Sequence, residues 1–101
     1  MSKIAAIIVT FNRLEYLKET VLSIQAQSLI PSEIIVVNNS STDGTLDWLH
    51  TQKNITVITQ NNLGGAGGFA TGIEYAYTKG HDWIWCMDDD VIPMQDCLEN
   101  L

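Results

Sequence analysis

The 101-residue sequence predicts an α/β fold in which a parallel sheet is flanked by helices. Four short apolar runs, rich in β-branched or aromatic residues, alternate with longer amphipathic or polar stretches. The first run, residues 4–9, is apolar on both faces, which is typical of a strand buried inside a parallel sheet. With 46% hydrophobic and 17% charged residues, the composition excludes a disordered tail, a collagen-like repeat and a coiled coil.

The first half of the chain is expected to contain two strands with a helix between them. The strands are residues 4–9 and 34–37, both rich in isoleucine and valine. Asn12, followed three residues later by Glu15, forms a capping-box pattern that predicts the start of the helix. Apolar residues at helical spacing then extend this helix to about Gln27.

The rest of the chain continues the alternation of strands and helices. The elements expected in order are a short helix around Trp48, a strand at 55–58, a glycine-rich loop at 60–68, a helix at 69–77, a strand at 83–87 and a final helix from Pro93 through Leu98.

Polar, glycine-rich and acidic residues follow each expected strand, at 10–13, 38–43, 60–68 and 88–90. The carboxyl ends of parallel strands share one edge of a sheet, and ligands bind there near the switch in strand order. We therefore expect the strand order 3-2-1-4, which places residues 10–12 beside residues 88–90.

The charge balance limits the class of partner. Five Lys and Arg residues against twelve Asp and Glu give a net charge of −7, which argues against nucleic acid and anionic membranes as main partners and leaves room for a bound cation. No apolar stretch approaches the ~18 residues of a transmembrane helix, so no membrane span is expected in this chain. Two cysteines do not form a disulfide framework, and a cytoplasmic location is expected.

Three consecutive aspartates directly follow the last strand. Carboxylates this close raise one another's pKa and oppose folding unless something compensates them. A divalent cation does so, because Asp88 and Asp90, two residues apart, can converge on one ion while Asp89 points elsewhere. The alternative is a solvated acidic turn in which Asp90 caps the final helix.

The glycine-rich stretch also resembles a dinucleotide-binding pattern, with Gly65 and Gly67 followed by Ala70 and with Asp88 downstream as a ribose ligand. Two observations oppose that interpretation. The pattern follows a later strand rather than the first, and three aspartates would repel a pyrophosphate without a metal. A non-catalytic nucleotide- or metal-binding module remains a second alternative.

Four motifs follow the four expected strands or include their ends. They are IIVTFNR at 7–13, EIIVVNNSSTDGT at 33–45, NNLGGAGGF at 61–69 and MDDD at 87–90. Together they resemble the inverting family 2 glycosyltransferases of the Rossmann-like GT-A fold, and specifically their galactofuranosyl- and rhamnosyltransferase-like branch. The resemblance covers nearly the whole chain and implies the N-terminal nucleotide-binding half of a GT-A domain, truncated in these 101 residues.

This resemblance implies a role for each motif. Thr10, Phe11 and Asn12 would line the pocket for uracil or thymine, and the glycine-rich stretch would approach the ribose and diphosphate. Asn39 occupies a position where many members carry an aspartate that pairs with the base, so base recognition here is uncharged. The implied nucleotide-binding residues are Thr10, Phe11, Asn12, Arg13, Asn39, Gly65, Ala66, Gly67, Asp88 and Asp89, and the implied metal ligands are Asp88 and Asp90.

The resemblance further implies inverting, metal-dependent transfer of a sugar to an acceptor. The donor would be a UDP- or dTDP-sugar, the metal Mn²⁺ or Mg²⁺, and the acceptor a glycan or lipid-linked molecule in the synthesis of a cell-envelope polysaccharide. The general base is expected beyond Leu101, so no catalytic residue is assigned in this chain, and the fragment alone is expected to be inactive and dimeric. The full-length protein would act in the cytoplasm, at the inner face of the membrane.

Overall fold

The computed structural model describes residues 3–61, 64–95 and 97–100, and its sheet is parallel with the order β3-β2-β1-β4. This confirms the predicted α/β class and strand order. The elements along the chain are β1 Ile4–Thr10, α1 Leu14–Gln25, β2 Glu33–Asn38, α2 Thr45–His50, β3 Ile55–Thr59, α3 Gly64–Thr78 and β4 Trp83–Asp88.

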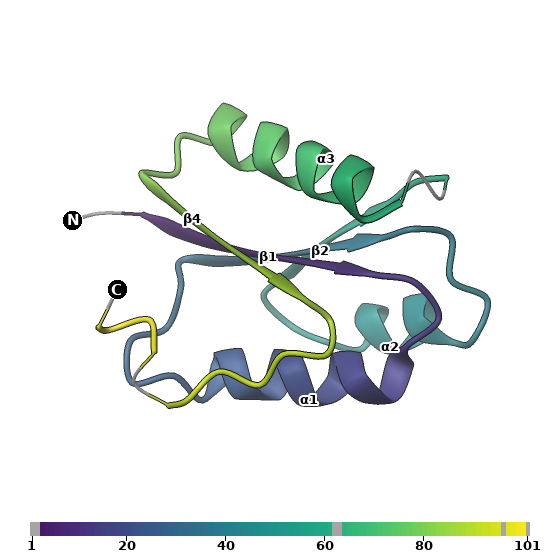
Figure 1. Ribbon diagram of the computed structural model, residues 1–101, viewed down its shortest axis with the longest axis horizontal. Coiled ribbons are helices and arrows are strands. Elements are labelled where there is room, and N and C mark those ends of the chain that lie inside the picture. The colour runs from purple at the N-terminus through teal and green to yellow at the C-terminus, as the bar shows by residue number, and fades with distance from the viewer. Residues whose placement is uncertain (1–2, 62–63, 96, 101) are drawn as a thin grey trace.

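The sheet lies between two helical layers (Figure 1). Helix α3 covers one face, and helices α1 and α2 cover the other. Alternate residues of the central strands serve the two layers: Ile7 and Val37 pack toward α3, whereas Ile8 and Val36 pack toward α1. Because β1 and β2 are buried on both faces, their sequences are almost continuously apolar.

Strand register brings the polar chain segments together at one edge. Thr10 pairs with Asn38 across β1 and β2, and Val9 pairs with Asp88 across β1 and β4. The chain therefore leaves all three strands at nearly the same level. The predicted neighbourhood of residues 10–12 and 88–90 follows from this register.

The start of α1 differs from the capping-box prediction. Asn12 adopts a positive φ of 52°, and its Oδ1 accepts a hydrogen bond of 2.6 Å from the Thr42 backbone N–H. The Leu14 N–H at the start of α1 instead donates to Asp43 Oδ2 at 3.1 Å. The prediction that Asn12 caps the helix was therefore wrong, because the loop after β2 supplies the acceptor across the tertiary fold.

The glycine-rich stretch is helical rather than a loop through Gly68, since α3 begins at Gly64. Its glycines allow the helix to lie close to the sheet. A Cβ at Gly68 would lie 2.5 Å from Val9 Cγ1, and one at Gly72 would lie 2.6 Å from Ile7 Cγ2. Close packing against β1 therefore explains both Gly68, which the sequence alone ascribes to a loop, and Gly72, which lies in the predicted helix.

The final helix expected from Pro93 through Leu98 does not form in the described residues, which have irregular backbone and turns there. This segment runs back along α1 (Figure 1) and is held by a buried side chain just past the end of that helix. Gln27 Nε2 donates to the Met94 carbonyl at 2.7 Å, and Gln27 Oε1 accepts from the Leu98 N–H at 3.0 Å. These bonds take the place of helical hydrogen bonds. Helix α1 itself ends at Gln25, two residues before the predicted end.

None of the helices in the described ranges combines the length and the apolar character that crossing a bilayer requires.

Candidate functional site

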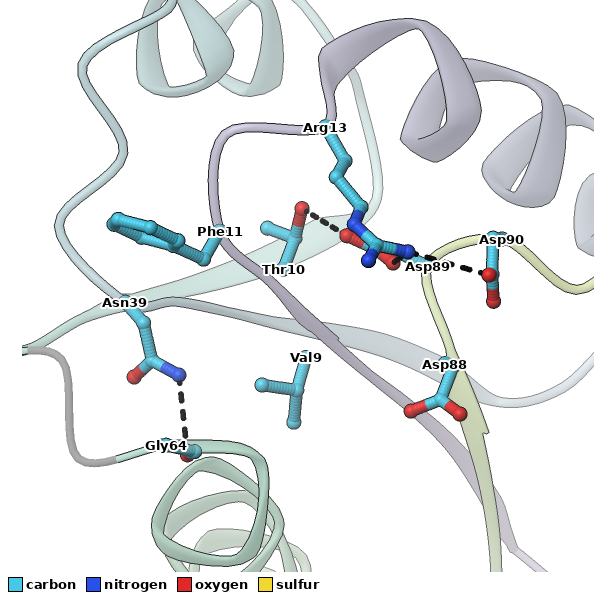
Figure 2. A pocket seen from close by; sticks show the side chains of 9 residues that line it. All are labelled: Val9, Thr10, Phe11, Arg13, Asn39, Gly64, Asp88, Asp89 and Asp90. Atoms are coloured by element: carbon cyan, nitrogen blue, oxygen red, sulfur yellow. Dashed lines mark hydrogen bonds and ion pairs between the residues drawn. The ribbon is translucent and has the colours of Figure 1, made fainter.

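A pocket of about 490 Å³ opens at the carboxyl edge of the sheet (Figure 2). One of its walls comes from the end of β1 and the start of α1, another from the end of β2 and the start of α3, and a third from the end of β4. Its lining residues are Val9, Thr10, Phe11, Arg13, Asn39, Gly64, Asp88, Asp89 and Asp90.

The three aspartates occupy different environments. Asp88 and Asp90 are exposed at the pocket, whereas Asp89 is only 5% exposed. Asp89 Oδ2 accepts a hydrogen bond of 2.9 Å from Thr10 Oγ1, which is itself buried. Asp89 therefore ties the end of β4 to the end of β1 and leaves the other two carboxylates open to solvent.

The turn that carries these aspartates is also fixed from α1. Thr20 is fully buried, and its Oγ1 lies 2.8 Å from the backbone carbonyls of both Asp89 and Val91. A single hydroxyl hydrogen is shared between these two acceptors. Sequence reasoning missed Thr20, although a threonine among the inward-facing positions Leu17, Val21 and Ile24 is a signal of a buried polar contact.

Burial raises the pKa of Asp89 above its usual 3.8, and the nearby Asp90 carboxylate raises it further. The Thr10 hydrogen bond and the Arg13 charge oppose this effect without cancelling it. Arg13 Nη1 lies 3.2 Å from Asp90 Oδ2 and 3.7 Å from Asp89 Oδ1. Among the residues that line the pocket, Arg13 thus supplies the positive charge beside the aspartates.

Asn39 forms the opposite wall, and both ends of its amide make a hydrogen bond within the chain. Its Nδ2 donates to the Gly64 carbonyl at 3.3 Å, and its Oδ1 accepts from Gln60 Nε2 at 2.9 Å. These bonds connect the end of β2 to the start of α3. Each amide atom has one further hydrogen-bonding position, an N–H on Nδ2 and a lone pair on Oδ1.

The remaining predicted site residues separate into two groups. Phe11 lines the pocket with an exposed ring, on the side of Asn39 and away from the aspartates (Figure 2). Asn12 does not line it and contacts the loop at Thr42 instead. Gly65, Ala66 and Gly67 lie in the first turn of α3, where Gly64 is the lining residue.

The pocket combines a neutral amide and aromatic wall with an acidic wall. Within the described part of the chain, no group of three or more His, Cys, Asp or Glu side chains is arranged to hold a metal ion. Two exposed carboxylates are nevertheless the usual protein contribution to a Mg²⁺ site, in which substrate phosphates and water supply the other ligands. The donor set therefore fits a hard divalent cation that arrives with a phosphorylated ligand.

The sequence profile of Glycosyl transferase family 2 matches residues 5–101. The chain belongs to this family. The resemblance stated from the motifs is thereby confirmed, and it takes precedence over the dinucleotide-binding alternative.

Curated relatives agree with this assignment. Galactofuranosyltransferase GlfT1 of Mycolicibacterium smegmatis is 36% identical over 92 residues, covering 89% of this chain and 30% of the relative. Poly-beta-1,6-N-acetyl-D-glucosamine synthase of Staphylococcus aureus is 30% identical over 97 residues, covering 92% of this chain and 23% of the relative. The chain thus spans less than a third of the length of these relatives.

Solved structures share the fold. S. aureus TarS in complex with UDP-GlcNAc superposes with a TM-score of 0.85 at 24% identity, covering 97% of this chain and 29% of that one. The mannosyltransferase PcManGT from Pyrobaculum calidifontis, in complex with GDP-Man and Mn²⁺, gives a TM-score of 0.77 at 23% identity, covering 90% of this chain and 28% of that one.

Proposed function

We propose that this chain is the donor-binding part of a glycosyltransferase that moves a sugar from a UDP- or dTDP-sugar to a glycan or lipid-linked acceptor with inversion. The observation that carries the proposal is the pocket at the switch in strand order, where exposed Asp88 and Asp90 face a neutral wall formed by Phe11 and Asn39. Family membership supports the reaction class, and the sugar-transferring relatives support a cell-envelope polysaccharide as product.

The two walls suit the two ends of a nucleotide. The exposed Phe11 ring offers a face on which a base can stack, and the Asn39 amide beside it has one remaining N–H and one remaining lone pair that could pair with the base. The diphosphate would then extend toward the aspartates. The neutral wall fits an uncharged base, and the acidic wall fits a diphosphate only when a cation accompanies it.

Asp88 and Asp90 would hold Mn²⁺ or Mg²⁺. A bound divalent ion would supply charge neutralisation for the departing diphosphate. Asp89 has a different task in this chain, because its hydrogen bond to Thr10 fixes the turn and thereby the directions of the two exposed carboxylates. Asp88 and Asp90 would therefore hold the metal, and Asp89 holds the turn, so we assign none of the three to take the proton of the acceptor hydroxyl.

The reaction itself is a displacement at the anomeric carbon. The acceptor hydroxyl oxygen forms the new bond to that carbon, and the bond from the carbon to the diphosphate oxygen breaks with its electron pair on the diphosphate. The hydroxyl proton passes to a general base, which we propose is supplied from outside the 101 residues. The task of this chain is to orient the donor for attack from the opposite face.

Calorimetry with UDP in the presence and absence of Mn²⁺ tests the proposal. We expect UDP binding that weakens at least tenfold when EDTA removes the metal, and a similar loss in Asp90→Asn. Asp47→Asn, an acid-to-amide change on α2 that does not line the pocket, is the matched control and should bind like the unmodified chain. Binding that is indifferent to both EDTA and Asp90→Asn would refute the metal assignment.

A further inference from the structure

Arg13 is the sole arginine of the sequence and the only basic residue among those that line the pocket in the described part of the chain. It stands immediately before α1 and reaches across to the turn after β4 (Figure 2). The same nitrogen, Nη1, approaches Asp90 Oδ2 at 3.2 Å and Asp89 Oδ1 at 3.7 Å. One positive charge thus faces two of the three carboxylates.

This contact is not what holds the aspartate turn in place. The Asp89 carboxylate accepts a hydrogen bond from the Thr10 hydroxyl, and the Asp89 backbone carbonyl accepts one from the Thr20 hydroxyl. Both hydrogen bonds are buried. The Arg13 side chain, by contrast, is 53% exposed, and that of its partner Asp90 is 46% exposed. Arg13 can therefore move away while the turn keeps its shape.

Arg13 also competes for a carboxylate that the proposed function assigns to a metal. A guanidinium within hydrogen-bond distance of Asp90 and a divalent ion bound to the same carboxylate would place positive charges a few ångströms apart, which is unfavourable. Arg13 at Asp90 therefore lowers the affinity of this carboxylate for a metal ion. A diphosphate beside the metal offers the displaced guanidinium a new anionic partner.

We propose that Arg13 is an internal counter-ion that occupies the aspartate turn before the donor arrives and is exchanged for the divalent cation when metal and nucleotide bind. The proposal rests on the metal-assisted donor binding proposed above. Arg13 weakens the binding of metal alone and strengthens the binding of metal together with a diphosphate. The pocket thereby favours a cation that arrives with the nucleotide over a free one.

Replacement of the charge gives the first test. Arg13→Gln should bind Mn²⁺ alone more tightly than the unmodified chain, by up to about fivefold, which is the upper end of what an exposed ion pair contributes. Lys18→Gln is the matched control, because it also removes one positive charge. Lys18 lies in α1, pairs with Glu15 and does not line the pocket. Titration of Mn²⁺ by electron paramagnetic resonance, without nucleotide, measures both.

The unmodified chain gives the second test and avoids any question of folding. A single arginine gives a single Nε–H signal in a ¹⁵N-correlated NMR spectrum, and this signal should shift as Mg²⁺ is added, with the same saturation as metal binding. An unmoved Arg13 signal at saturating Mg²⁺, or Arg13→Gln binding Mn²⁺ no more tightly than Lys18→Gln, would overturn the proposal. Failure of every variant to bind UDP would instead refute the proposed function, while tighter Mn²⁺ binding by Arg13→Gln would still support the counter-ion.

Discussion

The contact between α3 and β1 at Gly68 allows a sharp prediction, because it couples helix packing to the pocket. A Cβ at Gly68 would lie 2.5 Å from Val9 Cγ1, 3.0 Å from Val9 Cγ2 and 3.3 Å from Asn39 Nδ2. Ordinary contacts begin at 3.4 Å, so either the valine or the helix must move by nearly 1 Å. Val9 and Asn39 both line the pocket, and any such movement reaches the site.

The expected magnitude follows from two opposing effects. Extra volume in a packed core costs about 1–3 kcal/mol. Alanine in place of glycine inside a helix contributes about 1 kcal/mol in the opposite direction. We therefore expect Gly68→Ala to lower the free energy of unfolding by about 1 kcal/mol, or roughly 4–8 °C in melting temperature for a domain of this size.

Urea unfolding of four chains measures this effect. They are the unmodified protein, Gly68→Ala, Val9→Ala and the double variant, in which the smaller residue at position 9 makes room for the new methyl group. The double variant should be more stable than the sum of the single effects predicts, by about 1 kcal/mol. Gly72→Ala is the matched control for function, since its Cβ would meet Ile7, which does not line the pocket.

Two results would refute the reasoning on Gly68. One is a Gly68→Ala chain at least as stable as the original, together with additive single effects. The other is equal loss of UDP binding in Gly68→Ala and Gly72→Ala, which would show that the pocket does not depend on the contact between Val9 and α3.

Three further predictions follow from other contacts. Thr20→Val should lower the free energy of unfolding by about 1–3 kcal/mol, because it leaves the backbone carbonyls of Asp89 and Val91 without the Thr20 donor. Thr20→Ser keeps the hydroxyl and should retain most of the stability, and urea unfolding measures both variants. Burial raises the pKa of Glu33, but hydrogen bonds from Thr56 and His81, together with the His81 charge, outweigh burial and lower this pKa below the usual 4.5. Ionised Glu33 therefore stabilises the fold above pH 4.5. This stability should disappear as the pH falls from 4.5 through the lowered pKa, and Glu33→Gln should remove that part of the acid dependence of the melting temperature. Strand β4 lies at the edge of the sheet, and its Trp83 is 65% exposed, so we expect the chain to dimerise through this edge. Light scattering should detect the dimer and its dissociation in Trp83→Lys, and a monomer at high concentration would contradict the prediction.

The division between sequence and structure is clearest at the strand ends. Local patterns were sufficient to predict the strands, their order and the edge at which polar residues gather, because burial on both faces forces near-continuous apolar runs and parallel strands end together. The same patterns were sufficient to place Thr10, Phe11, Arg13, Asn39 and the aspartates in one region, and the structure brings these residues together around the pocket.

Local patterns failed where a partner lies far away in the chain. Asn12 has the sequence environment of a helix cap, but Asp43 accepts the hydrogen bond from the Leu14 N–H at the start of α1. The Asn12 side chain instead accepts a hydrogen bond from the Thr42 N–H. The glycines before Phe69 have the composition of a loop, but they begin α3, and at Gly68 the helix lies so close to Val9 that there is no room for a side chain. Propensity describes a segment in isolation, and in each case a tertiary contact was stronger.

The sequence by itself therefore determined the α/β class, the strand order and the residues available to the site, since these depend on hydrophobic pattern and chain order. Only the tertiary structure decided which of those residues are free to act. It buried Asp89 against Thr10, engaged both ends of the Asn39 amide and set Arg13 over Asp90. The physical reason is that hydrogen bonds and ion pairs between segments up to 79 residues apart depend on distances that exist only after the chain has folded.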